Sequence, residues 1–392
     1  MTDDLHPRTK LVHGGTDRSG HHEMSEALYL TQGFAYPDAE TAEARFDGSD
    51  PGYVYARYGN PTVGMFEQRL ALLEGAEACF ATASGMAAMN ASMFSQLQSG
   101  DHVVASRALF GSCHYILDSL LPRFGVQTTL VEGTDITAWQ NAVRPETKVF
   151  FLETPSNPTL EIIDIRAVAD VAHEAGAVLV VDNVFATPCF QRPLELGADI
   201  VMYSTTKHID GQGRCLGGAL LGSKEFVGGK LLEYMKHTGA AMSPFNAWVM
   251  LKGLETLDLR CRAAADSAEA IAQAVEGHSA VARAIHPGLS SHPQRALAAA
   301  QMERPGTMVS FELKGGKDAA FRFMNALEVV RISNNLGDAK SIATHPTTTT
   351  HQRMTEEDRL SLGITSGLIR LSVGLEHADD LIRDISRGLD AA

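Results

Sequence analysis

The stretch Ala198-Asp-Ile-Val-Met-Tyr-Ser-Thr-Thr-Lys207 predicts a short buried strand with a polar end. Its apolar run, Ile200–Met202, is typical of a short buried strand, and three hydroxyl residues then lead to one lysine. Ammonium groups are rarely held near a core, so Lys207 is either an ordinary surface residue or a functional one. A partly desolvated lysine has a lowered pKa, and its neutral amine can form a Schiff base with an aldehyde. The three hydroxyl groups could hold a phosphate.

Apolar segments before this stretch alternate with helical patterns, which predicts an α/β fold with an open, mostly parallel sheet covered on both faces. The expected strands lie near residues 103–104, 126–131, 149–152, 177–181 and 200–202, and a helix is expected over Ile165–Ala175. Ligands of such folds bind outside the carboxyl ends of the strands. Asp182 and Lys207, which each follow an expected strand, are therefore predicted to lie on the same edge of the sheet.

Asp182 directly follows the four aliphatic residues 178–181, where a carboxylate is costly unless it meets a partner. It could simply cap a turn with Asn183. Together with Lys207, however, it also suits a pyridine aldehyde, because the carboxylate would keep the ring nitrogen protonated while the lysine binds the aldehyde carbon. The residues alone leave both interpretations open.

Two further positions, Ser84-Gly85 and Arg370, each have a functional and a purely structural interpretation. Ser84-Gly85 opens an expected helix, whose free N–H groups and positive dipole end suit a phosphate, although many such helix starts bind nothing. Arg370 interrupts the apolar strand pattern Leu368–Val373. It could point outward from an alternating strand, or point inward and bind a carboxylate through two hydrogen bonds.

The chain is predicted to divide into an N-terminal arm (1–60), a large α/β domain (61–250) and a smaller C-terminal α+β domain (251–392). The arm lacks periodicity, and its end clusters three tyrosines and one arginine between residues 52 and 62, which suits packing on a partner subunit or lining a polar pocket. One long helical stretch is expected from Phe245 to about Ala274. Strands are expected at Met308–Leu313, Val329–Ile332 and Leu368–Val373.

The composition is that of an ordinary globular protein, with 44% hydrophobic and 20% charged residues in 392. The net charge of −14 argues against nucleic acid or an anionic membrane as the main partner. Five scattered cysteines without a CxxC pair indicate neither a disulfide framework nor a zinc site. No metal site, signal peptide or membrane span is predicted, and we expect a cytoplasmic protein that acts on small molecules.

Six ordered motifs resemble those of the Cys/Met-metabolism family of pyridoxal-phosphate enzymes, also called the transsulfuration family. They are Tyr55-Ala-Arg-Tyr-Gly-Asn-Pro-Thr62, Ser84-Gly-Met86, Glu153-Thr-Pro-Ser-Asn-Pro158, Val181-Asp-Asn183, Ser204-Thr-Thr-Lys207 and Ile369-Arg-Leu-Ser-Val-Gly374. The resemblance covers nearly the whole chain. It implies the pyridoxal-phosphate-dependent transferase fold (the aspartate-aminotransferase-like fold type I) and pyridoxal 5′-phosphate as cofactor.

The resemblance also implies a role for each matching residue. Lys207 would bind the cofactor aldehyde and carry protons, Asp182 would pair with the ring nitrogen, and Arg370 would bind the substrate α-carboxylate. The remaining implied cofactor contacts are Gly85, Met86, Ser204 and Thr206 on the phosphate, Tyr55 and Arg57 on the phosphate of a neighbouring subunit, Asn157 near the ring and Phe110 stacked on it. The family implies an obligatory dimer, assembled in most members into a homotetramer.

Phe110 departs from the family pattern, which has a stacking tyrosine at this position. Without the phenol hydroxyl, a possible proton donor to the leaving group is lost. A thiolate benefits from such a donor, whereas a carboxylate, with a reference pKa near 4, leaves well without it. Phe110 therefore favours an O-acylated homoserine over cystathionine or methionine as substrate.

Within the family, Phe110-Gly-Ser112, the loop Ile209–Gly217 and Asn335-Leu-Gly-Asp-Ala-Lys340 resemble the O-succinylhomoserine sulfhydrylases, and Asn335 is expected near the substrate. The resemblance implies γ-replacement on O-succinylhomoserine by sulfide, giving homocysteine and succinate in methionine biosynthesis. Cystathionine γ-synthase, O-acetylhomoserine sulfhydrylase and γ-lyase activities stay open. Arg45, Arg107 and Arg353 are candidates, by charge alone, for contacting the distal succinyl carboxylate. A nicotinamide dehydrogenase is disfavoured because no G-x-G-x-x-G joins a first strand to a helix.

Overall fold

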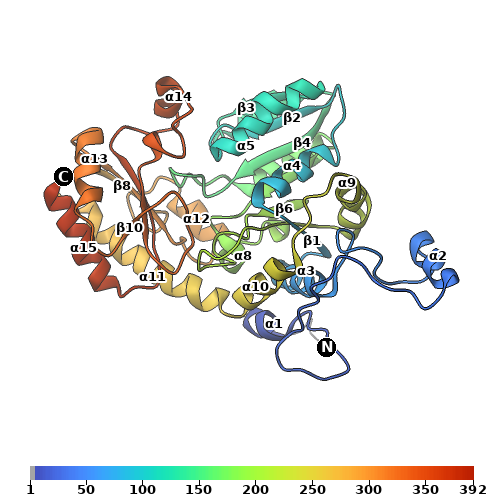
Figure 1. Cartoon of the computed structure of the whole chain (residues 1–392). Coiled ribbons are helices and arrows are strands. Elements are labelled where there is room, and N and C mark those ends of the chain that lie inside the picture. The colour runs from blue at the N-terminus through green and yellow to red at the C-terminus, as the bar shows by residue number, and fades with distance from the viewer. Residues whose placement is uncertain (1–4) are drawn as a thin grey trace. The chain divides into compact units, whose positions relative to one another are not determined.

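The computed structural model describes residues 5–392 and contains two compact units (Figure 1). Unit 1 comprises the residues up to Gln96 together with Met202–Thr206 and Arg214–Thr256, and unit 2 comprises Leu97–Val201, Lys207–Gly213 and Leu257–Ala392. The chain therefore passes between the units more than once. The predicted domains, with boundaries at residues 60 and 250, are instead continuous segments of the sequence. This division stays a prediction.

Unit 1 is mainly helical. Its elements are α1 (Pro7–His13), α2 (Ala39–Asp47), α3 (Pro61–Glu74), β1 (Ala78–Thr82), α4 (Gly85–Phe94), β7 (Gly218–Gly222), a π-helical turn (Phe226–Leu231), α9 (Leu232–Thr238) and α10 (Pro244–Glu255), and β1 pairs antiparallel with β7. The Asn60 side chain caps α3 by accepting hydrogen bonds from the N–H groups of Thr62 and Val63 at 2.9 and 3.4 Å. This cap and Pro61 at the first helical position account for the start of α3.

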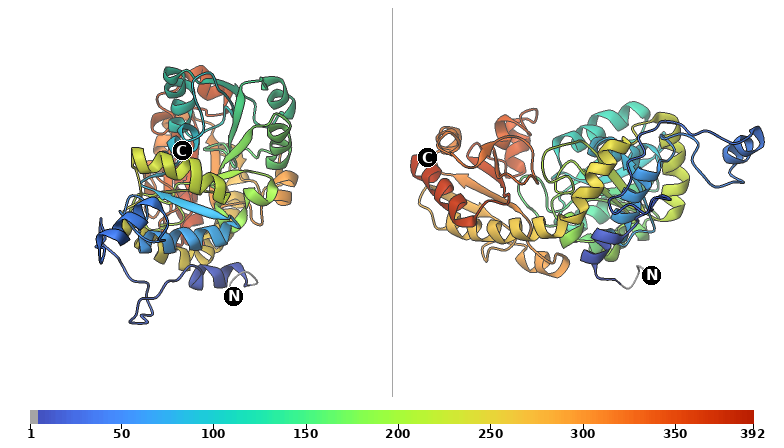
Figure 2. Two further views of the ribbon diagram at one scale, coloured as in Figure 1. Left: turned by 90° about the vertical axis from the view of Figure 1, so that its right-hand side faces the viewer. Right: turned by 60° about the horizontal axis from the view of Figure 1, so that its bottom comes forward.

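The first 60 residues contain two short helices, where an arm without packed structure was predicted. The α1 helix buries Leu11, which is 1% exposed. The α2 helix buries no residue, and its start depends on the Asp38 side chain, which accepts a hydrogen bond from the Thr41 N–H at 2.7 Å. Figure 2 shows α2 at the end of an extended segment that stands clear of the rest of the unit. Local capping, rather than a hydrophobic face, therefore accounts for α2.

Unit 2 carries four parallel strands in the order β5-β4-β2-β3: Val178–Asp182, Thr147–Glu153, His102–Ser106 and Gln127–Val131. The helical elements that accompany them are α5 (Gly111–Tyr115), a π turn (Ile116–Leu120), a 3₁₀ turn (Leu121–Phe124), α6 (Ile136–Ala142), α7 (Ile165–Glu174), α8 (Thr187–Phe190) and a second 3₁₀ turn (Pro193–Leu196). Trp139 stacks on Phe150 in a core that also takes in the buried face of α7. These pairings confirm a mostly parallel sheet, and β6 (Ile200–Tyr203) is fully buried, as predicted.

Unit 2 also contains a separate five-stranded sheet of order β10-β11-β12-β9-β8, in which all pairs except β10–β11 are antiparallel. Its strands are β8 (Val281–Ile285), β9 (Met308–Leu313), β10 (Arg331–Ile332), β11 (Ile342–Thr344) and β12 (Leu368–Ser372). The helices here are α11 (Leu257–Glu276), α12 (Arg295–Gln301), α13 (Gly316–Asn325), a 3₁₀ turn (Pro346–Thr348), α14 (Glu356–Ser361) and α15 (Ala378–Ala391). Phe311 meets Phe323 edge to face at 5.3 Å in the core between sheet and helices.

Two predicted boundaries change. The helical stretch expected from Phe245 to Ala274 is interrupted at Thr256, so that it forms α10 and α11. The strand expected at Val329–Ile332 shortens to two exposed residues, because the three N–H groups of residues 328–330 bind the buried carboxylate of Asp384 instead of a strand. No helix among residues 5–392 is long and apolar enough to cross a membrane.

Candidate active site

Lys207 lies in unit 2, four residues after the end of buried strand β6. Its Nζ donates a hydrogen bond to the side-chain oxygen of Asn335. Burial lowers the pKa of Lys207 to about 8; the positive charge of Arg370 adds to this effect, and the carboxylate of Asp182 opposes it. A minority of the amine is therefore neutral at physiological pH, a far larger fraction than for an ordinary lysine, and this neutral form is what the nucleophilic interpretation requires.

A glycine brings the Asn335 loop against the backbone of Lys207. Gly337 has φ +72°, and a Cβ added there would lie 2.6 Å from the His208 nitrogen and 2.9 Å from the Lys207 carbonyl carbon. Its N–H donates to the Ser372 hydroxyl at 2.8 Å. Only a residue without a side chain fits this approach, so Gly337 fixes the position of Asn335 relative to the lysine.

Asp182 and Glu153 end neighbouring parallel strands and lie opposite one another in the register of β5 and β4. Burial raises the pKa of Asp182 to about 7, although the Val184 N–H, 3.1 Å from its Oδ1, and the charge of Lys207 both act to lower it. Burial and the nearby Asp182 also raise the pKa of Glu153 well above its usual value. Asp182 does cap a turn, as the alternative interpretation held. With only this one N–H donor, however, the buried Asp182 carboxyl lacks a positively charged partner. It therefore suits the protonated nitrogen of a pyridine ring.

Glu153 supports the residue that replaces the family's stacking tyrosine. Its Oε2 accepts a hydrogen bond of 2.7 Å from the backbone N–H of Phe110, which begins α5. The Phe110 side chain is half-buried. Glu153 belongs to the motif Glu153–Pro158, but no function was predicted for it. Like Asp182, it stands at the end of a buried strand, and this signal could have identified it as a candidate site residue.

Arg370 points inward, so the alternative of an outward-facing arginine is wrong. The residue is 1% exposed, and its Nη1 donates to the Asn157 side-chain oxygen at 2.8 Å. Its Nη2 donates to the carbonyl groups of Asn334 and Asn335 and to the Thr344 hydroxyl at 3.1–3.2 Å. Among the residues that the structure describes, none is a hydrogen-bond partner of its buried Nε. A buried, unpaired guanidinium N–H is costly, and an incoming carboxylate would satisfy it.

His351 is a neighbour of this arginine that the sequence interpretation left without a role. It is 1% exposed, and its Nε2 has no partner. Burial and the charge of Arg370 lower the pKa of His351 to about 4, so the ring is neutral at pH 7. The only sequence signal was the unusually polar loop from His345 to His351, for which no packing reason was apparent.

The predicted phosphate-binding residues gather in unit 1. The Ser84 side chain caps α4 by accepting from the Ala87 N–H at 3.1 Å, and Gly85 is the first residue of the helix. A Cβ added to Gly85 would lie 2.6 Å from the Ser204 Cβ, so only glycine allows Ser204 to approach the helix start. The Thr206 hydroxyl exchanges hydrogen bonds with the backbone of Gly217 at 3.0 and 3.1 Å. Met86, the next residue of α4, is half-buried.

Tyr55 and Arg57, which were predicted to reach a neighbouring subunit, form a separate group in unit 1, in which Tyr55 is exposed and Arg57 is half-buried. The Arg57 guanidinium lies over the rings of Tyr55 and Tyr58, at 5.4 and 4.9 Å from their centres. Tyr55 is 39% exposed. The structure records no ion pair or hydrogen bond of the Arg57 side chain within residues 5–392, so its charge is available to a partner.

The whole chain matches a sequence family. The model described as "Cys/Met metabolism PLP-dependent enzyme" matches residues 8–390. The chain belongs to this family. A *Mycobacterium tuberculosis* relative named O-succinylhomoserine sulfhydrylase is 52% identical, covering 99% of this chain and 97% of its own, and a *Pseudomonas aeruginosa* relative of the same name is 49% identical, covering 98% and 95%. A *Porphyromonas gingivalis* relative named L-methionine γ-lyase is 40% identical, covering 98% and 96%.

A solved structure is similar throughout the fold. A *Campylobacter jejuni* protein titled putative O-acetylhomoserine (thiol)-lyase superimposes with a TM-score of 0.95 at 29% identity, covering 98% of this chain and 100% of its own. Its title names an N′-pyridoxyl-lysine-5′-monophosphate residue. These comparisons confirm the predicted family, fold class and cofactor.

The residues of this chain fit pyridoxal phosphate by their own chemistry. Lys207 offers an amine with a lowered pKa, Asp182 offers a buried carboxyl short of positive partners, and Arg370 has an unpaired Nε. The start of α4 has the free N–H groups that a phosphate needs. No group of three or more metal-ligating side chains lies within residues 5–392.

Proposed function

We propose that this enzyme catalyses γ-replacement on O-succinylhomoserine, in which sulfide displaces succinate and forms homocysteine for methionine biosynthesis. The observation that carries the chemistry is the buried set in unit 2 of a lysine, a carboxyl group and a guanidinium: Lys207, Asp182 and Arg370. The choice of substrate is supported by the names of the relatives, which are O-succinylhomoserine sulfhydrylase at 49–52% identity and L-methionine γ-lyase at 38–41%.

Pyridoxal phosphate, when bound, supplies an electron sink for the carbon atoms next to the substrate amino group. Asp182 would hold the positive charge of the cofactor ring nitrogen, which also removes the cost of its own buried carboxyl group. Lys207 would bind the cofactor and then take the proton from the substrate α-carbon. A pKa of about 8 suits that exchange, because a general base works best when its pKa lies near the working pH.

Arg370 and Asn335 would orient the substrate and the base. The unpaired Nε of Arg370 would bind the α-carboxylate, while Asn157 holds the other side of the guanidinium at 2.8 Å. Asn335, expected near the substrate, contacts Lys207 itself in this structure. We therefore assign it to positioning the amine so that the proton moves between defined atoms.

Arg353 is our candidate for contacting the distal succinyl carboxylate. Of the three arginines considered, Arg45 is ion-paired with Asp50 and Arg107 with Glu132. Arg353 is exposed and has no ion pair within the described part of the chain. Arg353→Ala should raise KM for O-succinylhomoserine about tenfold, as the loss of one charged contact implies. KM for O-acetylhomoserine, which lacks this carboxylate, should stay unchanged; equal effects on both donors would exclude the assignment.

The arm supports an assembly of at least two chains. We propose that Tyr55 and Arg57 reach the cofactor phosphate of a neighbouring subunit, so that the dimer is obligatory and the working form is a homotetramer. The exposed Tyr55, the half-buried Arg57 beside it and the helix α2, which buries no residue of its own, are the features that favour this role. We place the reaction in the cytoplasm, where reducing conditions suit a chain with five scattered cysteines and no CxxC pair.

Cystathionine γ-synthase is the second candidate function, because it shares the same first half-reaction and differs only in using cysteine in place of sulfide. A solved Corynebacterium glutamicum structure titled metB superimposes with a TM-score of 0.93 at 34% identity. Feeding sulfide and cysteine separately and identifying the amino-acid product distinguishes the two functions.

The role of Lys207 is tested on the purified holoenzyme by visible absorbance and borohydride reduction. Wild type should show the absorbance of a cofactor joined to a lysine, lose it on reduction, and give a peptide with the cofactor attached at Lys207. Lys207→Ala should lack both signals, while the exposed-site control Lys224→Ala should keep them. Attachment at another lysine would refute the assignment.

A further inference from the structure

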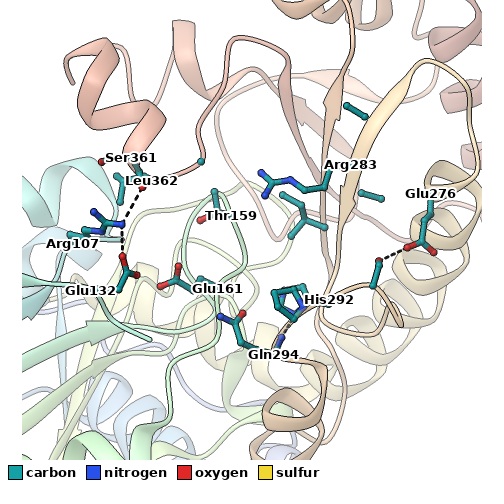
Figure 3. Close-up of a pocket in the computed structure, with 16 residues that line it drawn as sticks. Arg107, Glu132, Thr159, Glu161, Glu276, Arg283, His292, Gln294, Ser361 and Leu362 are labelled. Atoms are coloured by element: carbon teal, nitrogen blue, oxygen red, sulfur yellow. Dashed lines mark hydrogen bonds and ion pairs between the residues drawn. The ribbon is translucent and has the colours of Figure 1, made fainter. Parts of the chain in front are cut away.

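A cavity in unit 2 is lined by charged groups that the proposed reaction does not use. It has a volume of about 480 Å³ and is formed by segments after β2, β3 and β4, by strand β8 and by the loops before α12 and after α14 (Figure 3). This volume lies within the range of roughly 300–1,000 Å³ typical of small-molecule pockets. None of its lining residues belongs to the candidate active site.

One wall of the cavity carries an excess of negative charge. Arg107 forms an ion pair with Glu132 and donates to the Ser361 carbonyl at 3.2 Å. Within residues 5–392, Glu161 has no ion pair, and its buried Oε1 accepts no hydrogen bond. Burial and the neighbouring Glu132 raise the pKa of Glu161 to about 7, although the charge of Arg107 opposes this shift. An ammonium group is the partner that this carboxyl lacks.

The strand β8 contributes the opposite charge. Figure 3 shows Arg283 extending from β8 toward Thr159, with Glu161 and Gln294 below it. Arg283 is exposed, and within residues 5–392 its guanidinium has no ion pair or hydrogen bond. Glu161 and Arg283 thus line one cavity and do not pair with each other.

Two other polar side chains of the cavity already have hydrogen-bond partners. Both ring nitrogens of His292 are used, by the Leu160 carbonyl and the Gln294 N–H at 3.2 Å each. The Glu276 carboxylate accepts from the Ser291 hydroxyl. Apolar side chains, among them Ile285 and Leu362, complete the lining.

We propose that this cavity, the Glu161–Arg283 cavity, binds a zwitterionic amino acid, whose ammonium group pairs with Glu161 and whose carboxylate pairs with Arg283. A simple cation would leave Arg283 unpaired, and a simple anion would leave the Glu161 carboxyl buried without a donor. Only a ligand with both charges satisfies both residues. The apolar residues at the edge suit an uncharged aliphatic side chain. The site is separate from the reaction and does not depend on the proposed substrate.

The test measures binding of N,N-dimethyl-L-leucine to the holoenzyme by isothermal titration calorimetry. This probe keeps both charges and one N–H donor, but its tertiary amine cannot form a Schiff base with the cofactor. Wild type should bind one molecule per chain at the Glu161–Arg283 cavity. Glu161→Gln and Arg283→Ala should each weaken the affinity about tenfold or more, as loss of one charged contact implies.

Three controls make the result specific. The exposed-site variants Glu174→Gln and Arg331→Ala should bind as wild type does, and so should Arg370→Lys, which alters the active-site guanidinium. The amine alone (N,N-dimethyl-isopentylamine) and the carboxylate alone (4-methylpentanoate) should each bind about tenfold more weakly than the zwitterion. Visible absorbance checks that every variant holds its cofactor.

Three outcomes would overturn the proposal. They are no saturable binding to wild type, unchanged binding to both cavity variants, or loss of binding in Arg370→Lys alone, which would place the probe in the active site. Equal affinity for the zwitterion and either single-charge compound would exclude the ligand class.

Discussion

Replacing Arg370 with lysine keeps a positive charge but changes the shape of the donor, so it tests the proposed carboxylate site. The guanidinium uses Nη1 for Asn157 and Nη2 for three further acceptors, and its buried Nε is left for the substrate. A lysine ammonium cannot serve both sides at once. Truncating one partner of a buried charge pair costs about 2–5 kcal/mol. Because lysine retains the charge, we expect about 2–4 kcal/mol, which is roughly a 30- to 900-fold loss in kcat/KM.

The assay is steady-state kinetics of Arg370→Lys with O-succinylhomoserine and sulfide, beside urea unfolding and the visible absorbance of the cofactor. The absorbance should be unchanged, because Lys207 and Asp182 are intact. Thr344→Val is the matched control. It removes one acceptor from Arg370, at 3.2 Å, and should lower stability by about 1 kcal/mol with little effect on kcat/KM. A kcat/KM for Arg370→Lys within about threefold of wild type would refute the reasoning.

Three further changes probe the rest of the account. Asn335→Ala removes the hydrogen bond to the Lys207 amine and should lower kcat about tenfold with KM unchanged, which single-turnover kinetics would check. Phe110→Tyr adds a possible proton donor and should raise γ-elimination from methionine by at least about tenfold, seen as released methanethiol; an unchanged rate would contradict the leaving-group argument. Glu26→Gln breaks the buried ion pair with Arg69 and should cost about 3–5 kcal/mol of unfolding free energy. Burial alone would raise the pKa of Glu26, but hydrogen bonds from Lys252 and Arg69 lower it to about 2, so this stability should be complete above pH 4.5 and lost as the pH falls toward 2.

The candidate site residues at the carboxyl edge of the parallel sheet could be predicted from the sequence, because a polar residue directly after a buried strand lies at that edge. Asp182 and Lys207 each follow a run of buried aliphatic residues, and polar groups at the carboxyl ends of parallel strands are brought together by the fold. The same rule applies to Glu153, which was passed over because it stood inside a longer motif.

Contacts between residues far apart in the sequence could not be predicted from the pattern of apolar and polar residues. Lys207 and Asn335 are 128 positions apart, and their contact depends on the backbone approach at Gly337. The direction of Arg370 was also undecidable, since all five residues of β12 are buried and no alternation marks an outer face. The α2 helix was missed because it has no apolar face to produce periodicity.

The most direct test of the proposed function is a product assay of the purified enzyme. O-succinylhomoserine and O-acetylhomoserine would each be offered with sulfide or with cysteine, and cystathionine and methionine would be offered alone. We predict the highest kcat/KM for O-succinylhomoserine with sulfide, with homocysteine and succinate formed in equal amounts. Cystathionine as the main product from cysteine, or turnover of cystathionine or methionine much faster than that of either acyl donor, would contradict the account.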